Sequence, residues 1–246
     1  AASDVYKRQP TCWNEKIEFV LSGEEEEKKS PDLQSRDWRE RLSTSRDLGT
    51  GFAAPGGEFT RALYEWALTD RGNLLKDLLH GRRVVDLAAG MMPYGYALAA
   101  ACEAKNFVAV EPFYSDLQRN SVAGLIEERG ENLSRIPYKV EGVDMLEYLK
   151  GEPDDLLSVV ACGIEDCILP GPDYQKKVEG ELVRVLEADA FFLSSHSDLF
   201  PRELKSVEVH FPRPSNPRVT DRLRLHGGAD AFERYGKRIE ALTLMG

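Results

Sequence analysis

Three acidic side chains follow successive segments of the sequence that favour strands. Asp86 lies within RVVDLAA, Glu111 ends NFVAVE, and Asp144 follows the weaker segment YKVEGV. Short apolar runs of this kind predict strands that are buried on both faces of a parallel sheet. The carboxyl ends of such strands meet at one edge, where open α/β sheets bind their ligands. Each acid alone could cap a helix, but three in succession indicate a site that accepts hydrogen bonds and attracts positive charge.

The turn after the first segment is built from small residues. It reads DLAAG from Asp86 to Gly90, and a turn of this kind lets the backbone approach a ligand closely. Glu111 comes 21 residues after Gly90, where a carboxylate can accept hydrogen bonds from both hydroxyls of a ribose. Dinucleotide-binding proteins carry GxGxxG here and hold a pyrophosphate at the helix N-terminus. The sequence lacks that spacing and Asp86 would repel a pyrophosphate, so a nicotinamide or flavin dehydrogenase is the less favoured alternative.

Residues 82–197 resemble the class I S-adenosylmethionine-dependent methyltransferase family. The resemblance implies an α/β fold, a Rossmann-like three-layer sandwich whose mostly parallel sheet ends in a C-terminal antiparallel hairpin. It also implies S-adenosylmethionine as the cofactor, with methionine, ribose, adenine and methyl group at successive strand ends. The residues it places there are, in that order, Asp86, Ala88 and Gly90; Glu111 and Pro112; Asp144 and Met145; and Cys162 and Gly163. Ala88 and Met92 replace the outer glycines of the family's D-x-G-x-G-x-G turn, so a non-catalytic binding module on this fold stays open as an alternative.

Three residues after the fourth and fifth predicted strands are candidate catalytic groups. Glu165 and Asp166 could act as a base or orient an amine, and His196 has a side chain that titrates near neutral pH. We expect methyl transfer to oxygen or nitrogen of a small molecule, with a protein or RNA acceptor as the alternative. The Asn/Asp-Pro-Pro-Tyr/Phe signature of amino-group methylases is absent, and Cys162 lacks the preceding proline of the cytosine-C5 methylases.

The pattern of elements divides the chain in two. Residues 1–50 form an N-terminal extension that we expect to be partly flexible, and residues 1–9 look foreign to the natural sequence. Residues 51–246 form the methyltransferase-like domain, which opens with a helical lid over 51–81. Strands alternating with helices are predicted at 83–89, 106–111, 138–143, 156–162 and 190–194, followed by a hairpin of strands at 206–211 and 238–244. We expect Asp173 to cap the helix before the fifth strand.

Charge and composition narrow the possible partners. The 246 residues carry 32 basic and 42 acidic side chains, a net charge of −10, which disfavours nucleic acid despite the local cluster of Arg218, Arg222 and Arg224. No apolar run is long enough to span a bilayer, and no secretory signal is recognisable, so we expect a cytoplasmic protein. The four cysteines show no CxxC or zinc-finger spacing, so we expect reduced thiols and no metal site.

Overall fold

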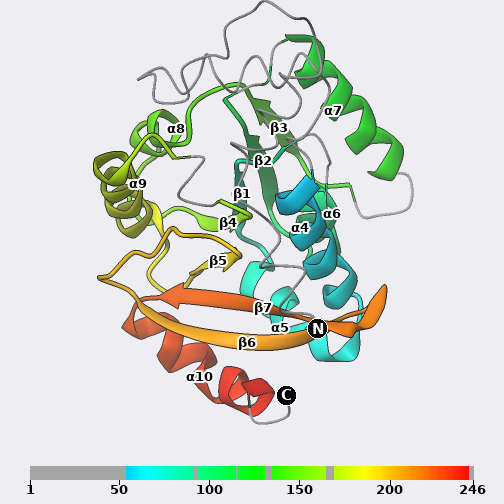
Figure 1. The fold of residues 1–246 in the computed structure, drawn as a ribbon, viewed down its shortest axis with the longest axis vertical. Coiled ribbons are helices and arrows are strands. Elements are labelled where there is room, and N and C mark those ends of the chain that lie inside the picture. Colours follow the sequence, from blue (N-terminus) through cyan, green and yellow to red (C-terminus); the bar gives the residue numbers. More distant parts are fainter. Residues whose placement is uncertain are drawn as a thin grey trace, which may run out of the picture.

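The computed structural model describes residues 54–90, 94–112, 114, 116–130, 135–164 and 169–243, which surround one seven-stranded sheet (Figure 1). The strands are β1 Arg83–Leu87, β2 Asn106–Val110, β3 Tyr138–Glu141, β4 Ser158–Cys162, β5 Phe191–Ser195, β6 Lys205–Arg213 and β7 Asn216–Gly227. They lie in the order β3-β2-β1-β4-β5-β7-β6. Strands β1 to β5 are parallel, and β7 is antiparallel to both β5 and β6. The strand order reverses between β1 and β4, which is where open parallel sheets bind their ligands.

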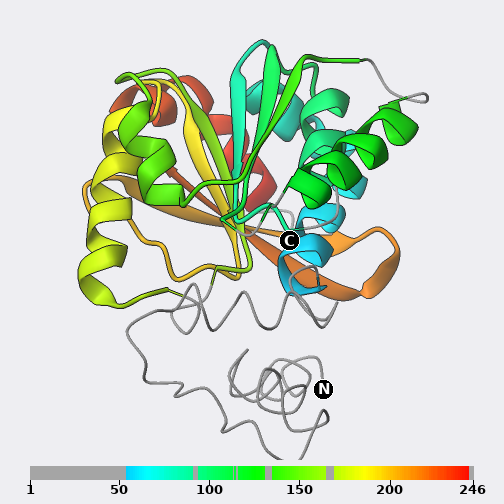
Figure 2. The ribbon, with the colours of Figure 1, turned by 90° about the horizontal axis from the view of Figure 1, so that it is seen from above.

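Helices cover both faces of the sheet, so the domain has the three layers that the sequence predicts (Figure 2). The helices of the first face are α4 Ala54–Ala67, α5 Asn73–Leu79, α6 Tyr94–Ala101, α7 Asp116–Gly130 and α10 Ala229–Thr243. The helices of the second face are α8 Met145–Gly151 and α9 Pro172–Val185. A 3-10 turn, η1 Asp70–Gly72, joins α4 to α5.

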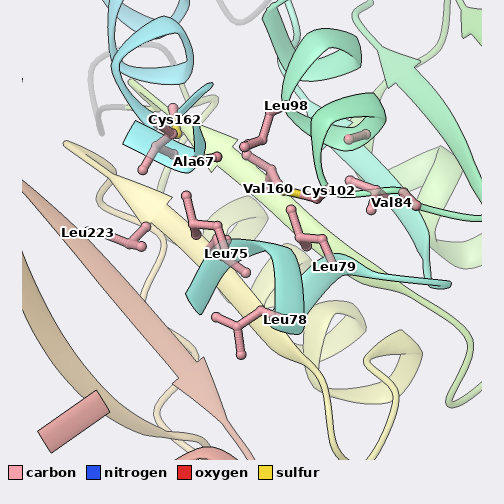
Figure 3. Close-up of a cluster of buried hydrophobic side chains, with 14 of the residues drawn as sticks. Ala67, Leu75, Leu78, Leu79, Val84, Leu98, Cys102, Val160, Cys162 and Leu223 are labelled. Carbon is pink, nitrogen blue, oxygen red and sulfur yellow. The ribbon is translucent and has the colours of Figure 1, made fainter. Parts of the chain in front are cut away.

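Strand side chains alternate between two apolar cores, one on each face. In β1, Val84 belongs to the first core, whereas Val85 and Leu87 belong to the second. Every residue of β4 is buried because both of its faces are covered. Figure 3 shows the first core, in which Cys162 lies close to Ala67 of α4. Because strand side chains alternate with period two, Asp86, two residues after Val84, also faces this first layer of helices.

The five predicted parallel strands are confirmed to within two residues at each end. The C-terminal hairpin is confirmed as well, but the prediction of its second strand at 238–244 is wrong. Residues 238–243 belong to α10, in which Ala231, Tyr235 and Ile239 recur every four residues and bury one side of the helix. The second strand is β7, whose charged residues obscure an alternating pattern that buries Leu223 and Leu225.

The prediction that Asp173 caps a helix is also wrong. The N-cap position of α9 is Gly171, which has a positive φ of 141°, and Pro172 occupies the first turn. Proline suits that position because its fixed φ is helical and it has no N–H left to satisfy. Asp173 lies in the first turn, where its charge still complements the helix dipole.

Arginines pair with acids at the amino end of the sheet, where β1 to β5 begin. Arg82, just before β1, hydrogen-bonds to Glu187 and Asp189 just before β5, with 2.8 Å to the Asp189 Oδ1. Arg83 hydrogen-bonds to Glu152 at 2.6 Å. These ion pairs link the start of β1 to the segment before β5 and to the end of α8.

In the described ranges, no helix is both long and apolar enough to cross a membrane. The predicted extension, residues 1–50, lies outside the described residues. The segment 51–81 is helical where it is described, through α4, η1 and α5. Its role as a lid stays a prediction.

Candidate functional site

Two buried carboxyl groups meet at the carboxyl ends of β1 and β2. Asp86 is 3% exposed and Glu111 is 5% exposed. Asp86 comes two residues after Val84, and Glu111 comes two residues after Ala109. Val84 and Ala109 belong to the first core, so both acids face the layer that contains α4 and α6. Burial, together with the nearby charge of Glu111, raises the pKa of Asp86 to about 8. Among the described residues, no cation or hydrogen-bond donor contacts the Asp86 carboxyl, so nothing there offsets the cost of ionising it.

The turn after β1 closes around these acids. The Gly90 N–H donates to Glu111 Oε2 at 3.4 Å, and the hydroxyl of Tyr114 donates to the Gly90 carbonyl. Burial, Glu111 and Asp86 raise the pKa of Tyr114, so its hydroxyl stays a donor. At Gly95 in the first turn of α6, a Cβ would lie 2.1 Å from Asp86 Oδ2, so only glycine lets the helix approach this carboxyl.

Ala88 occupies the first glycine position of the family turn and has a φ of 55°. This left-handed conformation costs an L-residue about 1 kcal/mol relative to glycine. Gly90 also has a positive φ, 63°. The backbone at Ala88 therefore has a conformation that glycine adopts more readily than alanine. Met92 lies outside the described residues.

The structure gives Asp144 a structural role beside the predicted one. Its Oδ1 accepts hydrogen bonds from the N–H groups of Leu146 and Glu147, which caps α8, and its Oδ2 accepts one from the Tyr174 hydroxyl at 2.8 Å. Met145 is buried in the second core beside Leu146. Asp86 and Glu111 interact electrostatically, whereas Asp144 is anchored to its own helix.

Cys162 and Gly163 lie where β4 ends, beside the end of β1. Cys162 is buried, and its pKa is raised to about 12 by burial and, secondarily, by Asp86, while a hydrogen bond with Thr60 of α4 opposes the shift. It is therefore a neutral thiol at physiological pH. Gly163 has a φ of 71°, and Pro112, half-buried, follows Glu111.

His196 lies directly after β5, with a φ of 50°. Its ring stacks on Phe59 of α4, with centroids 3.8 Å apart and planes 17° apart. Its Nε2 is 3.9 Å from Oδ1 of Asp221, which is 1% exposed and is held by Arg213 through bonds of 2.8 and 3.0 Å. Burial lowers the pKa of His196 to about 4, against the opposing effect of Asp221, and Arg222, Arg213 and Arg224 lower it further. The imidazole is therefore neutral at pH 7.

These groups form a row across the carboxyl end of the sheet. In spatial order they belong to β2, β1, β4, β5, β7 and β6, and they are Glu111, Asp86, Cys162, His196, Asp221 and Arg213. Helix α4 crosses the row, because Thr60 reaches Cys162 and Phe59 stacks on His196. The row is acidic at the β2–β1 side and carries a histidine at the β5 side, so it offers two chemically different halves.

Some candidates do not join this row. Glu165 and Asp166 lie outside the described residues. Two of the arginines in the predicted basic cluster, Arg222 and Arg224, lie 3.6 and 3.5 Å from the carboxylate of Glu208. Among residues that the structure describes, no group of three or more histidines, cysteines and acids is placed to hold a metal ion.

Sequence reasoning missed Tyr114, Asp221 and Arg213. Asp221 and Arg213 meet because of the β6–β7 register, which the misplaced second strand concealed. One available signal was the alternation in β7, which places Asp221 on the same side as Leu223 and Leu225. A charged residue at an inward position of a strand is unusual and marks a partner or a site.

No family model matches the chain, and no curated protein matches it in sequence. Among solved structures, it is similar to the 1,6-didemethyltoxoflavin-N1-methyltransferase of Burkholderia thailandensis with bound S-adenosylhomocysteine (14% identity, TM-score 0.48, 83% of this chain and 93% of that chain). It is similar to the M1A22 tRNA methyltransferase TrmK of B. subtilis (15% identity, TM-score 0.42, 69% of this chain and 70% of that chain). It is also similar to the spermidine synthase of Thermotoga maritima (9% identity, TM-score 0.47, 75% of this chain and 70% of that chain). These similarities are too distant to assign the fold, so the assignment rests on the order and direction of the strands.

The strand order supplies that assignment. After five parallel strands, β7 lies antiparallel between β5 and β6, which is the reversed C-terminal hairpin that the resemblance implies. The chain has the class I methyltransferase fold. Within the methyltransferase fold, the Asp86–Glu111 half of the row coincides with the strand ends at which the resemblance places the cofactor.

Proposed function

We propose that this protein is an S-adenosylmethionine-dependent methyltransferase that acts on oxygen or nitrogen of a small molecule. One observation carries the proposal: Asp86 and Glu111 are buried together at the ends of β1 and β2, with the pKa of Asp86 raised to about 8. Burial and the charge of Glu111 both oppose the ionisation of Asp86, so a carboxylate there is costly unless a positive group lies beside it. S-adenosylmethionine brings an ammonium, a sulfonium and two ribose hydroxyls.

The residues present fit this cofactor. Asp86 would face the ammonium of the methionine part beside Ala88 and Gly90, and Glu111 would accept hydrogen bonds from the ribose hydroxyls with Pro112 next to it. Gly95 supports the fit because its missing side chain leaves the Asp86 carboxyl accessible from α6. Asp144 and Met145 would lie at the adenine, and Cys162 and Gly163 near the methyl group. When bound, the cofactor supplies an activated methyl group, and the protein contributes binding and alignment.

The acceptor belongs, in this proposal, on the β5 side of the row. His196 is neutral, and its side chain keeps 17% of its surface exposed, so it can receive a proton from an acceptor. Glu165 and Asp166 remain candidates on sequence grounds. A small molecule is favoured over RNA because the net charge is −10 and because Glu208 offsets Arg222 and Arg224.

Calorimetric titration with S-adenosylmethionine and S-adenosylhomocysteine tests the proposal. We expect both to bind the wild-type protein, and we expect Asp86→Asn to weaken binding about 10- to 100-fold, because a charge-assisted hydrogen bond is lost. Asp154→Asn is the matched control, since Asp154 is an exposed acid paired with Arg184 at the amino end. Absence of binding by a folded wild-type protein would refute the proposal.

A binding module without catalysis is the second candidate function, and Ala88 favours it. The Ala88 methyl group stands where the family has a glycine, and extra atoms there restrict the approach of the cofactor to the backbone. The two functions separate in a screen of metabolites with labelled S-adenosylmethionine. The module predicts binding with no labelled product, whereas the enzyme predicts at least one methylated product.

A further inference from the structure

We propose that Asp221, held by Arg213, is a positioning residue that orients His196 as the proton acceptor for the methylated substrate. The inference rests on the proposed methyl transfer, but the geometry that suggests it is separate from the cofactor half of the site. It assigns a role to the β6–β7 hairpin, which supplies both Arg213 and Asp221.

The Arg213–Asp221 pair is fixed before any ligand arrives. Both nitrogen–oxygen contacts are within 3.0 Å and engage both carboxylate oxygens, which is the bidentate geometry that defines an orientation. Asp221 is 1% exposed, so its charge is weakly screened by water. Arg213 also lies over the Phe59 ring, 5.9 Å from its centroid, so it contacts the ring on which His196 stacks.

The imidazole is held on two sides. Phe59 packs flat against the ring and fixes its plane, and Asp221 faces the Nε2 edge at 3.9 Å. A carboxylate facing Nε2 favours the tautomer in which Nε2 carries the hydrogen, because an N–H dipole that points at a negative charge is stabilised. In that tautomer Nδ1 carries the lone pair. The 3.9 Å separation is longer than a hydrogen bond, and such contacts often shorten when a substrate is bound.

Among the described residues, the charges that act on His196 come from the β6–β7 hairpin. Asp221, Arg222 and Arg224 lie on β7 and Arg213 lies on β6, whereas α4 contributes the uncharged Phe59. The arginines disfavour a resting imidazolium, and Asp221 is the group that stabilises one when it forms. This combination suits a base that is neutral before the reaction and charged after it.

The chemistry balances with these groups. An acceptor with an O–H or N–H bond forms a new bond to the methyl carbon, and the electron pair of the broken carbon–sulfur bond stays on sulfur. The acceptor's proton passes to Nδ1 of His196, which becomes an imidazolium facing Asp221. The proton then leaves to solvent, to which 17% of the His196 side chain is exposed. We therefore infer an acceptor that loses a proton, such as a hydroxyl or an amine, over one that accepts a methyl group without deprotonation.

Nitrogen-15 NMR of the imidazoles tests this inference without an acceptor. The chain has four histidines, and His196→Gln identifies the signals of His196 by their loss. In the wild type we expect His196 to be predominantly the Nε2–H tautomer at pH 7. In Asp221→Asn the carboxamide can donate to Nε2, so the Nδ1–H tautomer should gain about tenfold in population relative to Nε2–H. A wild type that is mainly Nδ1–H, or a tautomer ratio unchanged in Asp221→Asn, would overturn the inference.

Two further variants keep the test decisive. If Asp221→Asn does not fold, Arg213→Lys removes the bidentate hold while keeping the charge, and it should shift the tautomer ratio in the same direction by a smaller factor. Asp189→Asn is the matched control, because it removes an arginine-paired aspartate at the amino end, and it should leave the ratio unchanged. Titration of the same samples with S-adenosylhomocysteine separates the proposed methyl transfer from the orientation of His196. If the wild-type protein does not bind this ligand, methyl transfer is refuted whichever tautomer His196 adopts.

Discussion

Acidic residues at the two ends of the sheet have opposite surroundings. At the amino end, Glu187 and Asp189 share Arg82, and hydrogen bonds from Arg82 lower the pKa of Asp189. At the carboxyl end, Asp86 faces Glu111, and its pKa is raised to about 8. Asp189 therefore stabilises the folded chain as a carboxylate, whereas Asp86 destabilises it whenever it is ionised. The comparison teaches that the amino end of the sheet is built for stability, whereas the carboxyl end is suited to a positively charged ligand.

The largest expected effect is that Asp86→Asn stabilises the empty protein. A carboxyl whose pKa is higher in the folded than in the unfolded state loses stability as pH rises from about 4 to about 8. Asparagine removes that loss, so we expect the free energy of unfolding at pH 8 to rise by up to about 5 kcal/mol. Urea unfolding from pH 4 to 8 measures the difference between variant and wild type. A variant that is less stable than the wild type at pH 8 would contradict the comparison.

Removal of an arginine at the amino end should have the opposite sign. Arg82→Leu leaves Glu187 and Asp189 without their shared arginine, and we expect it to cost about 2 kcal/mol, less than a fully buried pair because both acids are partly exposed. Affinity for S-adenosylhomocysteine should not change. Unfolding and calorimetry on the same sample check both statements, and a parallel fall in affinity would show that the two ends are not independent.

Glu111→Gln should shift the pH dependence of ligand binding. A cation binds Asp86 best when Asp86 is ionised, so wild-type affinity should rise with pH up to about 8. Burial is the larger cause of that pKa and Glu111 the smaller. Removal of the Glu111 charge should therefore move the midpoint of the affinity profile to lower pH, in addition to weakening binding through the lost ribose contact. Calorimetric titrations across the pH range measure the midpoint. An unmoved midpoint would show that the charge of Glu111 does not affect the ionisation of Asp86.

The smallest expected effect concerns the turn that joins these acids. Ala88→Gly should stabilise the protein by about 0.5 kcal/mol, because relief of the left-handed conformation outweighs the greater entropy of glycine in the unfolded chain. Ala89→Gly is the neighbouring control, and it should destabilise, since Ala89 is not among the residues with a positive φ. Equal effects of the two substitutions, measured by urea unfolding, would count against strain at Ala88.

The sequence predicted the parallel part of the fold and the acidic half of the row. Uninterrupted apolar segments identify β1, β2 and β4, and the acids Asp86 and Glu111 follow from where those segments stop. Local patterns identified His196 but could not show that it meets Asp221 and Arg213, because these three residues come together only through strand pairing across the sheet. The same limit applies to Asp144, since its cap on α8 was foreseeable from its position but its bond with Tyr174 depends on how α9 packs.

Proton release on ligand binding tests the central claim most directly. If Asp86 holds a proton in the empty protein and a cationic ligand replaces it, binding at pH 7 should release close to one proton, because a group with a pKa of about 8 is mostly protonated there. Calorimetric titration of S-adenosylmethionine in buffers with different heats of ionisation counts that proton, and Asp86→Asn should abolish its release. Tight binding by the wild type with no proton released, or with the same number released by Asp86→Asn, would contradict the assignment of Asp86 as the group that receives the cation.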